Sequence, residues 1–402
     1  MSYVLRDYQQ KASDAAVSFF ANKSKKNNAI MVLPTGSGKS LVIADIASRL
    51  EGLTLVFQPS KEILEQNYMK LCSYGILDCS IYSASYGILD CSIYSASFGR
   101  KDISRITFAT IGSVVNHPEL FQHFQNIIID ECHLVNPKEG MYKDFLSMLK
   151  CKVLGLTATP YRLSSSRNFG SMLKFITRTR PCVFSEVIYQ VQISTLLDMG
   201  YLAKLNYYAM NPLGWNELNL KVNTTGADYT DKSVVKEYDR IDFYGYLVSI
   251  VRRLMTPKVG GKRKGILVFT RFLKEADRLR RSVPGTAVVS GETPKKERER
   301  ILTAFKSGEI PVVANVGVLT TGFDFPELDT IVMARPTMSL ALWYQIVGRA
   351  IRPHPNKEAG WIVDLCGNIK RFGEVKDLRL VDGGNGKWAV YSNNRQLTNV
   401  RF

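Results

Sequence analysis

Short apolar runs alternate along the chain with longer segments in which apolar residues recur every three to four positions. Residues 29–33 (AIMVL) form such a run, residues 41–50 follow with the longer period, and residues 124–129 (FQNIII) form another run. Short continuous runs are typical of buried parallel strands, and the longer period is typical of helices. The first half of the chain therefore predicts a mainly parallel sheet flanked by helices.

The second half repeats the pattern. It predicts a helix over residues 241–255, a strand over residues 265–269 and another strand over residues 330–334. Residues 211–231 are polar and rich in turn formers, which predicts an irregular excursion. The α/β alternation thus occurs twice, so we predict two tandem lobes, each a mainly parallel sheet flanked by helices.

The composition changes again near the C-terminus, where GGNG and NN turns flank an alternating segment around Trp388. This is typical of a β-hairpin. We predict a first lobe over residues 1–181, a second over residues 182–376 and a small β-rich appendage over residues 377–402.

Residues 73–84 and 85–96 are identical, each reading SYGILDCSIYSA. Two copies are too few for a solenoid. One copy supplies what the fold needs, because Gly75 can end the preceding helix and residues 79–82 can form a strand. We expect the second copy to be surplus, and both a recent duplication and a sequence-assembly artefact remain open.

A glycine-rich loop joins the first strand to the first long amphipathic segment. Its residues are Thr35, Gly36, Ser37, Gly38, Lys39 and Ser40. Glycines let backbone N–H groups surround an anion at a helix N-terminus. We expect Lys39 to reach the β- and γ-phosphates of a nucleotide and the Ser40 hydroxyl to bind Mg²⁺.

Two acidic residues, Asp130 and Glu131, follow the apolar run that ends at residue 129. Ligands of open α/β sheets bind at the carboxyl ends of strands. Asp130 is our second candidate for holding Mg²⁺, through water. Glu131 is our candidate for orienting and deprotonating the attacking water. Together with the glycine loop, these residues predict an ATP-hydrolysing site.

Several further motifs occur in a fixed order: LRDYQ from Leu5, FQPSKE from Phe57, TIGS from Thr110, TATP from Thr157 and QIVGRAIR from Gln345. With these motifs the chain resembles the superfamily 2 helicases of the DEAD/DEAH type, most closely their bacterial RadD-like branch. The resemblance covers most of the chain. It implies two RecA-like lobes and an ATP held in the cleft between them.

The resemblance also implies roles for individual residues. Nucleotide contacts are implied for Arg6, Gln9, Gly322 and Asp324, with Gln9 on the edge of the adenine base. Action on the γ-phosphate is implied for Arg349 and Arg352, with Gln345 beside them. Contacts to nucleic acid are implied for Pro59, Ser60, Lys61, Thr110, Gly112, Ser113, Thr270 and Thr320. Coupling of hydrolysis to strand movement is implied for His133, Thr157 and Thr159.

The net charge and the hydropathy of the chain limit the classes of partner that it can bind. The net charge is +17, most of it in the second half, which fits a polyanion such as nucleic acid. No apolar run approaches the roughly 20 residues of a membrane span, and the N-terminus lacks a signal pattern. We therefore expect a cytoplasmic monomer that binds single-stranded or branched nucleic acid and no membrane. Residues 257–264 (PKVGGKRK) are a basic loop, either solvated or in contact with phosphate.

We interpret the chain as an ATP-dependent translocase or helicase that uses ATP and Mg²⁺. The family resemblance implies DNA as the substrate, and the residues themselves leave an RNA helicase open. An ATPase clamp that responds to nucleic acid without processive unwinding is a further alternative. A P-loop ATPase with no motor function would leave the motifs of the second lobe unexplained.

Overall fold

The structure is a computed structural model of the 402-residue chain. It describes residues 4–24, 27–73, 91–166, 170–210, 218–224, 227–256, 263, 265–320 and 323–400. These residues divide into two compact units. The first comprises Met1–Arg162, Lys174–Gln192 and Leu380–Ala389, and the second comprises Leu163–Leu173, Ile193–Arg379 and Val390–Phe402.

The first unit contains a sheet with the strand order β10-β1-β7-β6-β2-β5-β3-β4. Neighbouring strands are parallel except β3 and β4. The strands are β1 (Ala29–Val32), β2 (Thr54–Phe57), β3 (Cys91–Ser95), β4 (Arg100–Lys101), β5 (Ile106–Ala109), β6 (Asn126–Ile129), β7 (Lys152–Thr157) and β10 (Glu186–Gln190). The helices are α1 (Asp7–Ala21), α2 (Lys39–Arg49), α3 (Lys61–Ser73), α4 (Ile111–Val114) and α5 (Met141–Ser147).

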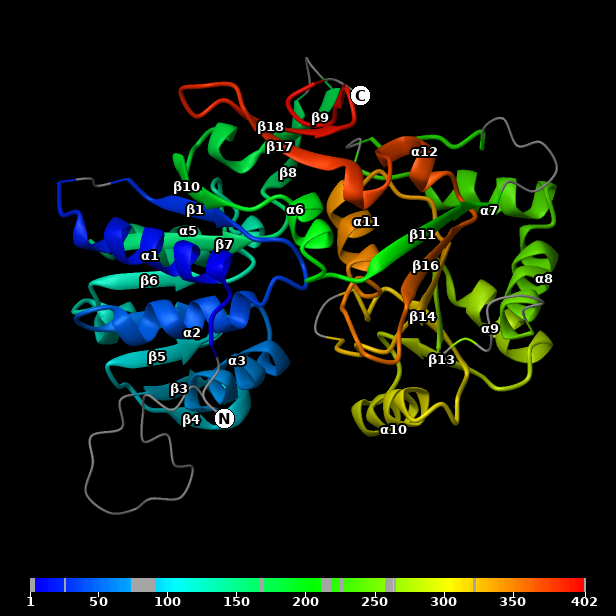
Figure 1. Ribbon diagram of the computed structural model, residues 1–402, viewed down its shortest axis with the longest axis horizontal. Helices are drawn as coiled ribbons and strands as arrows, with labels where there is room; N and C mark the ends of the chain where they lie inside the picture. The colour runs from blue at the N-terminus through cyan, green and yellow to red at the C-terminus, as the bar shows by residue number, and fades with distance from the viewer. Residues whose placement is uncertain are drawn as a thin grey trace. The chain divides into compact units, whose positions relative to one another are not determined.

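Helices α1, α2 and α3 lie side by side in the first unit (Figure 1). A polar cluster joins α1 to α2 through the Ser13 hydroxyl, which donates to Asp45. Arg49 Nη1 donates to Ser13 Oγ at 3.0 Å, and Arg49 also pairs with Asp14 at 2.7 Å. Because Ser13 is fully buried, these bonds satisfy polar groups that would otherwise destabilise the interface between the helices.

The second unit contains a fully parallel sheet with the strand order β11-β16-β15-β12-β14-β13. The strands are β11 (Lys204–Ala209), β12 (Ile266–Thr270), β13 (Thr286–Ser290), β14 (Val312–Val316), β15 (Thr330–Ala334) and β16 (Ala359–Asp364). The helices are α6 (Ile193–Asp198), α7 (Asp231–Arg240), α8 (Phe243–Met255), α9 (Leu273–Ser282), α10 (Lys295–Lys306), α11 (Leu340–Val347) and α12 (Asn368–Phe372).

One face of this sheet packs against α7, α8 and α9. Val268, Val332 and Val363, from three neighbouring strands, share a buried cluster with Tyr238 and Leu247 of these helices. Figure 1 shows α8 and α9 on one side of the sheet and α11 on the other. The prediction of two lobes, each a mainly parallel sheet flanked by helices, is confirmed.

Strands β8 (Tyr161–Ser166) and β9 (Gly170–Phe175) form a two-stranded sheet. The predicted β-rich C-terminal segment is also confirmed. It forms a three-stranded sheet of β17 (Leu378–Asp382), β18 (Trp388–Ser392) and β19 (Arg395–Gln396). Among the helices that the structure describes, none is both long enough and apolar enough to cross a bilayer.

The structure differs from the predicted boundaries in two places. Strand β10 pairs with β1, so the first unit extends to Gln192 rather than ending at residue 181. The second copy of the repeat forms the strand next to β5, as β3, whereas residues 79–82 of the first copy lie outside the described residues.

Candidate functional site

The glycine loop lies between β1 and α2, as predicted. Gly36 and Gly38 both have left-handed backbones, with φ of 82° and 79°. A Cβ atom at Gly38 would also lie 2.4 Å from Gln9 Nε2. Gly38 is therefore required both by its backbone conformation and by the close approach of Gln9. The loop ends at the N-terminus of α2, where the free N–H groups favour an anion.

The residues predicted to contact the adenine base lie at the start of α1, and this segment hydrogen-bonds to the glycine loop. Gln9 Nε2 donates to Ser37 O at 2.8 Å, and the Tyr8 hydroxyl donates to the same oxygen at 2.7 Å. Gln9 Oε1 accepts from the Arg6 backbone N–H at 2.9 Å. The structure thus brings Arg6 and Gln9 to the phosphate loop, while their contact with a base stays a prediction.

The two acids lie at the end of β6, beside the loop. Glu131 Oε1 is 3.6 Å from Lys39 Nζ, and Asp130 Oδ1 accepts from the Glu131 backbone N–H at 2.9 Å. Glu131 itself has a left-handed backbone, a conformation whose strain is typical of functional positions. Burial, and then the neighbouring Glu131 carboxylate, raise the pKa of Asp130.

Two observations show that these residues suit a polyphosphate and a divalent cation. The buried Ser37 Oγ has no hydrogen-bond partner among the described residues, so the loop holds an unused polar group. The raised pKa of Asp130 reflects a buried carboxylate that a nearby cation would stabilise in its ionised form. Asp130 and the Ser40 hydroxyl are the groups that would hold Mg²⁺.

The three residues predicted to couple hydrolysis to movement lie together. His133 Nδ1 is 2.9 Å from Thr157 Oγ1 and 3.1 Å from Thr159 Oγ1. The same nitrogen lies 3.3 Å from Glu131 Oε2. A movement of the Glu131 side chain can therefore be transmitted to the end of β7 by the imidazole ring of His133.

Asn67 of α3 belongs to this site although nothing in its local sequence indicates it. Its side-chain Nδ2 donates to Gln58 Oε1 at 2.8 Å and lies 3.4 Å from Asp130 Oδ2. Gln58 immediately precedes Pro59, Ser60 and Lys61, which are predicted to contact nucleic acid. Asn67 thus links the acidic pair to the segment expected to hold nucleic acid.

The predicted nucleic-acid contacts of the first unit follow the carboxyl ends of β2 and β5. Thr110 Oγ1 is 2.9 Å from Ser113 Oγ, which accepts from the Ala96 N–H at 3.1 Å. Lys61 Nζ donates to Ser97 O at 2.6 Å and lies 4.1 Å from the centre of the Phe98 ring. Residues 96–98 therefore contact both segments that were predicted to bind nucleic acid, residues 59–61 and residues 110–113. The sequence motifs did not reveal this connection. Pro59, Ser60 and Gly112 lie in the same two segments.

In the second unit, Arg349 is buried and holds the loop that follows β14. Its Nη1 donates to Phe323 O at 2.8 Å and its Nη2 to Thr320 O at 2.6 Å. The structure therefore gives Arg349 a positioning contact in addition to the role that the resemblance implies. Arg352 pairs with Asp324, and burial lowers the pKa of Arg352.

The remaining predicted residues of this unit lie at the ends of neighbouring elements. Gln345 is half-buried on α11, and Thr270 is buried at the end of β12, where its hydroxyl lies 3.4 Å from Asn315 O. Gly322 lies outside the described residues. The nucleotide and nucleic-acid roles of these side chains stay predictions.

Lys357 was not predicted, yet it ties together the two segments that carry Asp324 and Arg352. Its buried ammonium donates to Pro326 O at 2.7 Å, and to Leu328 O and Ala350 O at 3.1 Å each. Burial lowers the pKa of Lys357 to about 8, whereas the three carbonyl oxygens favour the charged form.

Replacing Lys357 with methionine is expected to destabilise the second unit. The methionine keeps the apolar length of the side chain but leaves three buried carbonyls without their donor, at a cost of about 1–3 kcal/mol. Thermal unfolding should show a midpoint lowered by several degrees. The matched control is Lys296→Met on the exposed face of α10, which should unfold like the wild type. Equal midpoints for both variants would show that the three bonds contribute little.

Two family models match the chain. The model described as "Type III restriction enzyme, res subunit" matches residues 2–162, and "Helicase conserved C-terminal domain" matches residues 247–354. The first match contains the glycine loop and the acidic pair, and the second contains Asp324, Arg349 and Arg352. Their order along the chain is the order of the two units.

Among curated proteins, the chain is 24% identical to the "Putative ATP-dependent helicase IRC3" of Saccharomyces cerevisiae, over 90% of this chain and 52% of that protein. It is 25% identical to the "DNA 3'-5' translocase XPB2" of Sulfurisphaera tokodaii, over 88% of this chain and 80% of that protein. The chain thus spans about half the length of the yeast relative. Among solved structures, a fragment of a putative HsdR subunit of a type I restriction enzyme from Vibrio vulnificus matches with a TM-score of 0.66 and 21% identity, over 92% of this chain and 66% of that one.

The predicted family is confirmed at the level of the superfamily, while the RadD-like branch stays a prediction, since no match singles it out. The structural likeness supports the tandem RecA-like fold, and the two family models cover the motifs on which the prediction rested. Residues 2–162 and 247–354 thus match the two domains typical of superfamily 2 helicases, and relatives that align with most of the chain are named as helicases or translocases.

Proposed function

We propose that the chain is an ATP-dependent translocase or helicase that acts on DNA. The observation that carries the proposal is the line of contacts in the first unit from Lys39 to Glu131, and from Glu131 through His133 to Thr157. Asn67 extends these contacts from Asp130 to the segment before Lys61. Groups suited to hydrolysis and groups suited to strand binding are therefore connected within one unit.

The chemistry follows from the positions of these side chains. The glycine loop and Lys39 bind the phosphates of ATP, and Glu131 orients the attacking water and accepts its proton. Mg²⁺ held by Asp130 and Ser40 would supply neutralising charge on the phosphate oxygens. A movement of Glu131 displaces the imidazole of His133, which in turn shifts Thr157 and Thr159.

Arg352 is the candidate of the second unit for stabilising charge on the γ-phosphate. In the structure it pairs with Asp324, which the family resemblance implies as a nucleotide contact. Arg349 and Lys357 hold the surrounding loop through five backbone carbonyls in total, three for Lys357 and two for Arg349. We infer that these bonds keep Arg352 oriented.

The choice of DNA rests on the relatives. One of them is named a DNA translocase, and a further solved structure similar in fold, a restriction-modification enzyme, is described as bound to DNA. The net charge of +17 suits either nucleic acid. The cytoplasmic location and the monomeric state stay predictions.

The test is ATP hydrolysis measured with single-stranded DNA, single-stranded RNA or neither. DNA is expected to stimulate hydrolysis most, and a translocation assay is expected to show movement along the strand. Stimulation without movement would favour the ATPase clamp, and stronger stimulation by RNA would favour an RNA helicase. Absence of any stimulation would contradict the proposal.

Binding of single-stranded DNA is expected to weaken steeply as salt rises. Contacts to phosphates release counterions, so log K should fall linearly with log salt. Strands of equal length and different sequence should bind within roughly tenfold of one another, because backbone contacts carry no sequence information. Fluorescence anisotropy at several salt concentrations measures both properties. A flat salt dependence would contradict a phosphate-binding groove.

A further inference from the structure

The edge strand of the second sheet presents polar and aromatic side chains on one face. Lys204, Asn206 and Tyr208 alternate along β11, so they share that face. The strand pairing places Ala359 opposite Lys204 and Trp361 opposite Asn206 on the neighbouring strand β16. Lys204 is exposed, and Tyr208 is 41% exposed despite its size.

Three of the side chains at this edge form a stack. The rings of Tyr208 and Trp361 are 5.1 Å apart and tilted by 5°, and the guanidinium carbon of Arg263 lies 3.8 Å from the centre of the Trp361 ring. Arg263 precedes β12, and β11 and β12 lie on opposite sides of β16. Trp361 is therefore layered between Arg263 and Tyr208, and Tyr208 forms the outer end of the stack.

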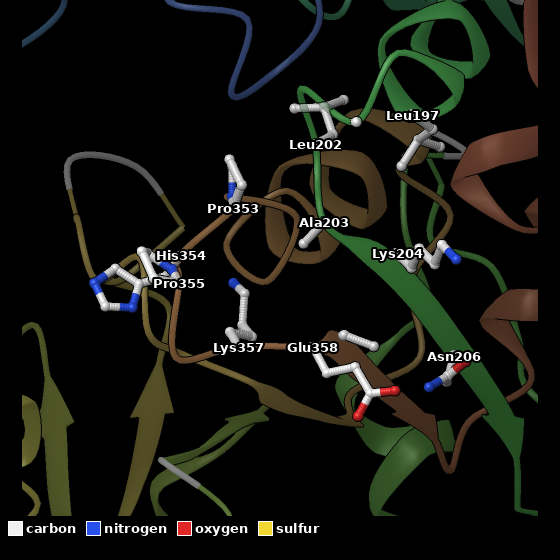
Figure 2. A pocket seen from close by; sticks show the side chains of 12 residues that line it. Leu197, Leu202, Ala203, Lys204, Asn206, Pro353, His354, Pro355, Lys357 and Glu358 are labelled. Carbon is white, nitrogen blue, oxygen red and sulfur yellow. The ribbon is translucent and has the colours of Figure 1, made fainter.

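A cavity of about 660 Å³ opens beside the first residues of β11 and β16. Lys204, Asn206 and Ala359 line it from the sheet, and the loop with Pro353 and Lys357 lines its other side. Figure 2 shows Lys204 and Asn206 along β11, and Lys357 across the cavity from them. Glu358 is the one acidic side chain among the described residues that line the cavity.

This surface is separated from the motifs already assigned to nucleic acid in the second unit by the order of the strands. Thr270 is the last residue of β12 and Thr320 follows β14, and β16 and β15 lie between β12 and the edge strand β11. Lys204 and Ala359 are the first residues of β11 and β16, whereas Tyr208 lies near the carboxyl end of β11. Farther along the same face, Val268, Val332 and Val363 are buried under α7, α8 and α9.

The chemistry of the surface suits one occupant, an unpaired strand of nucleic acid. An exposed aromatic ring offers a stacking partner for a base, and a base can stack on it only when it is unpaired. Lys204 lies about 13 Å along the strand from Tyr208 and can contact a phosphate. Arg263 adds a further positive charge beside the Trp361 ring.

We propose that Tyr208, Lys204 and the stacked Trp361 and Arg263 form a second contact site for single-stranded nucleic acid, outside the family motifs. A base stacks on the outer face of Tyr208, and the adjoining backbone runs past Lys204 toward the cavity. The inference rests on the proposed nucleic-acid function and adds a contact that would hold a strand leaving the motor.

The test compares Tyr208→Leu with Tyr208→Phe in the full-length chain. Leucine keeps apolar area but removes the ring, so a 40-nucleotide oligo-dT should bind about tenfold more weakly, whereas the phenylalanine variant should bind like the wild type. Lys204→Ala should lower the salt slope by about 1, and Lys232→Ala, an exposed lysine on α7, should leave it unchanged. Glu358→Gln should strengthen binding, because it removes the negative charge at the cavity.

The outcomes separate this site from the proposed function. Wild-type protein that binds no oligonucleotide would overturn the proposed function itself. Wild-type binding that Tyr208→Leu and Lys204→Ala leave unchanged would overturn this site alone. An equal loss of duplex binding in Tyr208→Leu would contradict base stacking. A change of oligomeric state with no change in oligonucleotide binding would instead assign the surface to a second copy of the chain.

Discussion

Replacing Lys39 with alanine is expected to abolish ATP turnover. In the structure Lys39 stands at the N-terminus of α2 with its ammonium 3.6 Å from Glu131. The substitution removes a charge-assisted contact to the phosphates and leaves Glu131 without its cation. Steady-state hydrolysis in the presence of single-stranded DNA measures the effect, and we expect a rate indistinguishable from background.

Lys11 provides the matched control in the same unit. It too pairs with a carboxylate, Asp7, at 2.8 Å, but it is exposed on α1. An exposed pair of this kind contributes little, about 0–1 kcal/mol, so Lys11→Ala should hydrolyse ATP like the wild type. If Lys39→Ala kept half of the wild-type kcat, the glycine loop would not be the phosphate site.

Replacing Glu131 with glutamine is expected to stop hydrolysis while ATP and DNA still bind. The amide keeps the shape of the side chain beside Lys39 and His133, but it cannot accept the proton of the attacking water. Single-turnover hydrolysis of pre-bound Mg²⁺-ATP isolates this step from binding and product release. We expect a loss of several orders of magnitude in that rate, with nucleotide affinity within a few-fold of the wild type.

The control for Glu131 is a second carboxylate that faces an imidazole. Glu119 Oε1 lies 3.4 Å from His117 Nδ1, and both side chains are exposed. Glu119→Gln should therefore leave the single-turnover rate unchanged. A normal rate in Glu131→Gln would place the general base at another residue.

The local parts of the candidate site were predictable from the sequence because each depends on a few neighbouring residues. An apolar run predicted β1, and the glycines after it predicted the loop at Gly36 and Gly38. The run that became β6 ends directly before Asp130. Parallel strands place such ends at one edge of a sheet, so the order of motifs alone indicated that Lys39 and Glu131 would meet.

Contacts between distant segments were not predictable in this way. Nothing near Asn67 indicates that it lies beside Asp130, 63 residues later, because that contact depends on how α3 packs against the sheet. Lys357 resembles any lysine of a polar loop until its ammonium is found among three carbonyl oxygens. Arg349 is similar, since an arginine in a turn after a helix is more often solvated than bonded to two backbone carbonyls.

Periodicity and short motifs are local properties of the chain, so they were enough to predict the superfamily, the two α/β lobes and the glycine loop between β1 and α2. The place of β10 in the first sheet and the choice of the second repeat copy as β3 depend on strand pairing, since the two copies are identical in sequence. Tertiary structure also decided that Arg263, Trp361 and Tyr208 stack, because these side chains come from three strands or strand ends that are brought together by the order of the sheet.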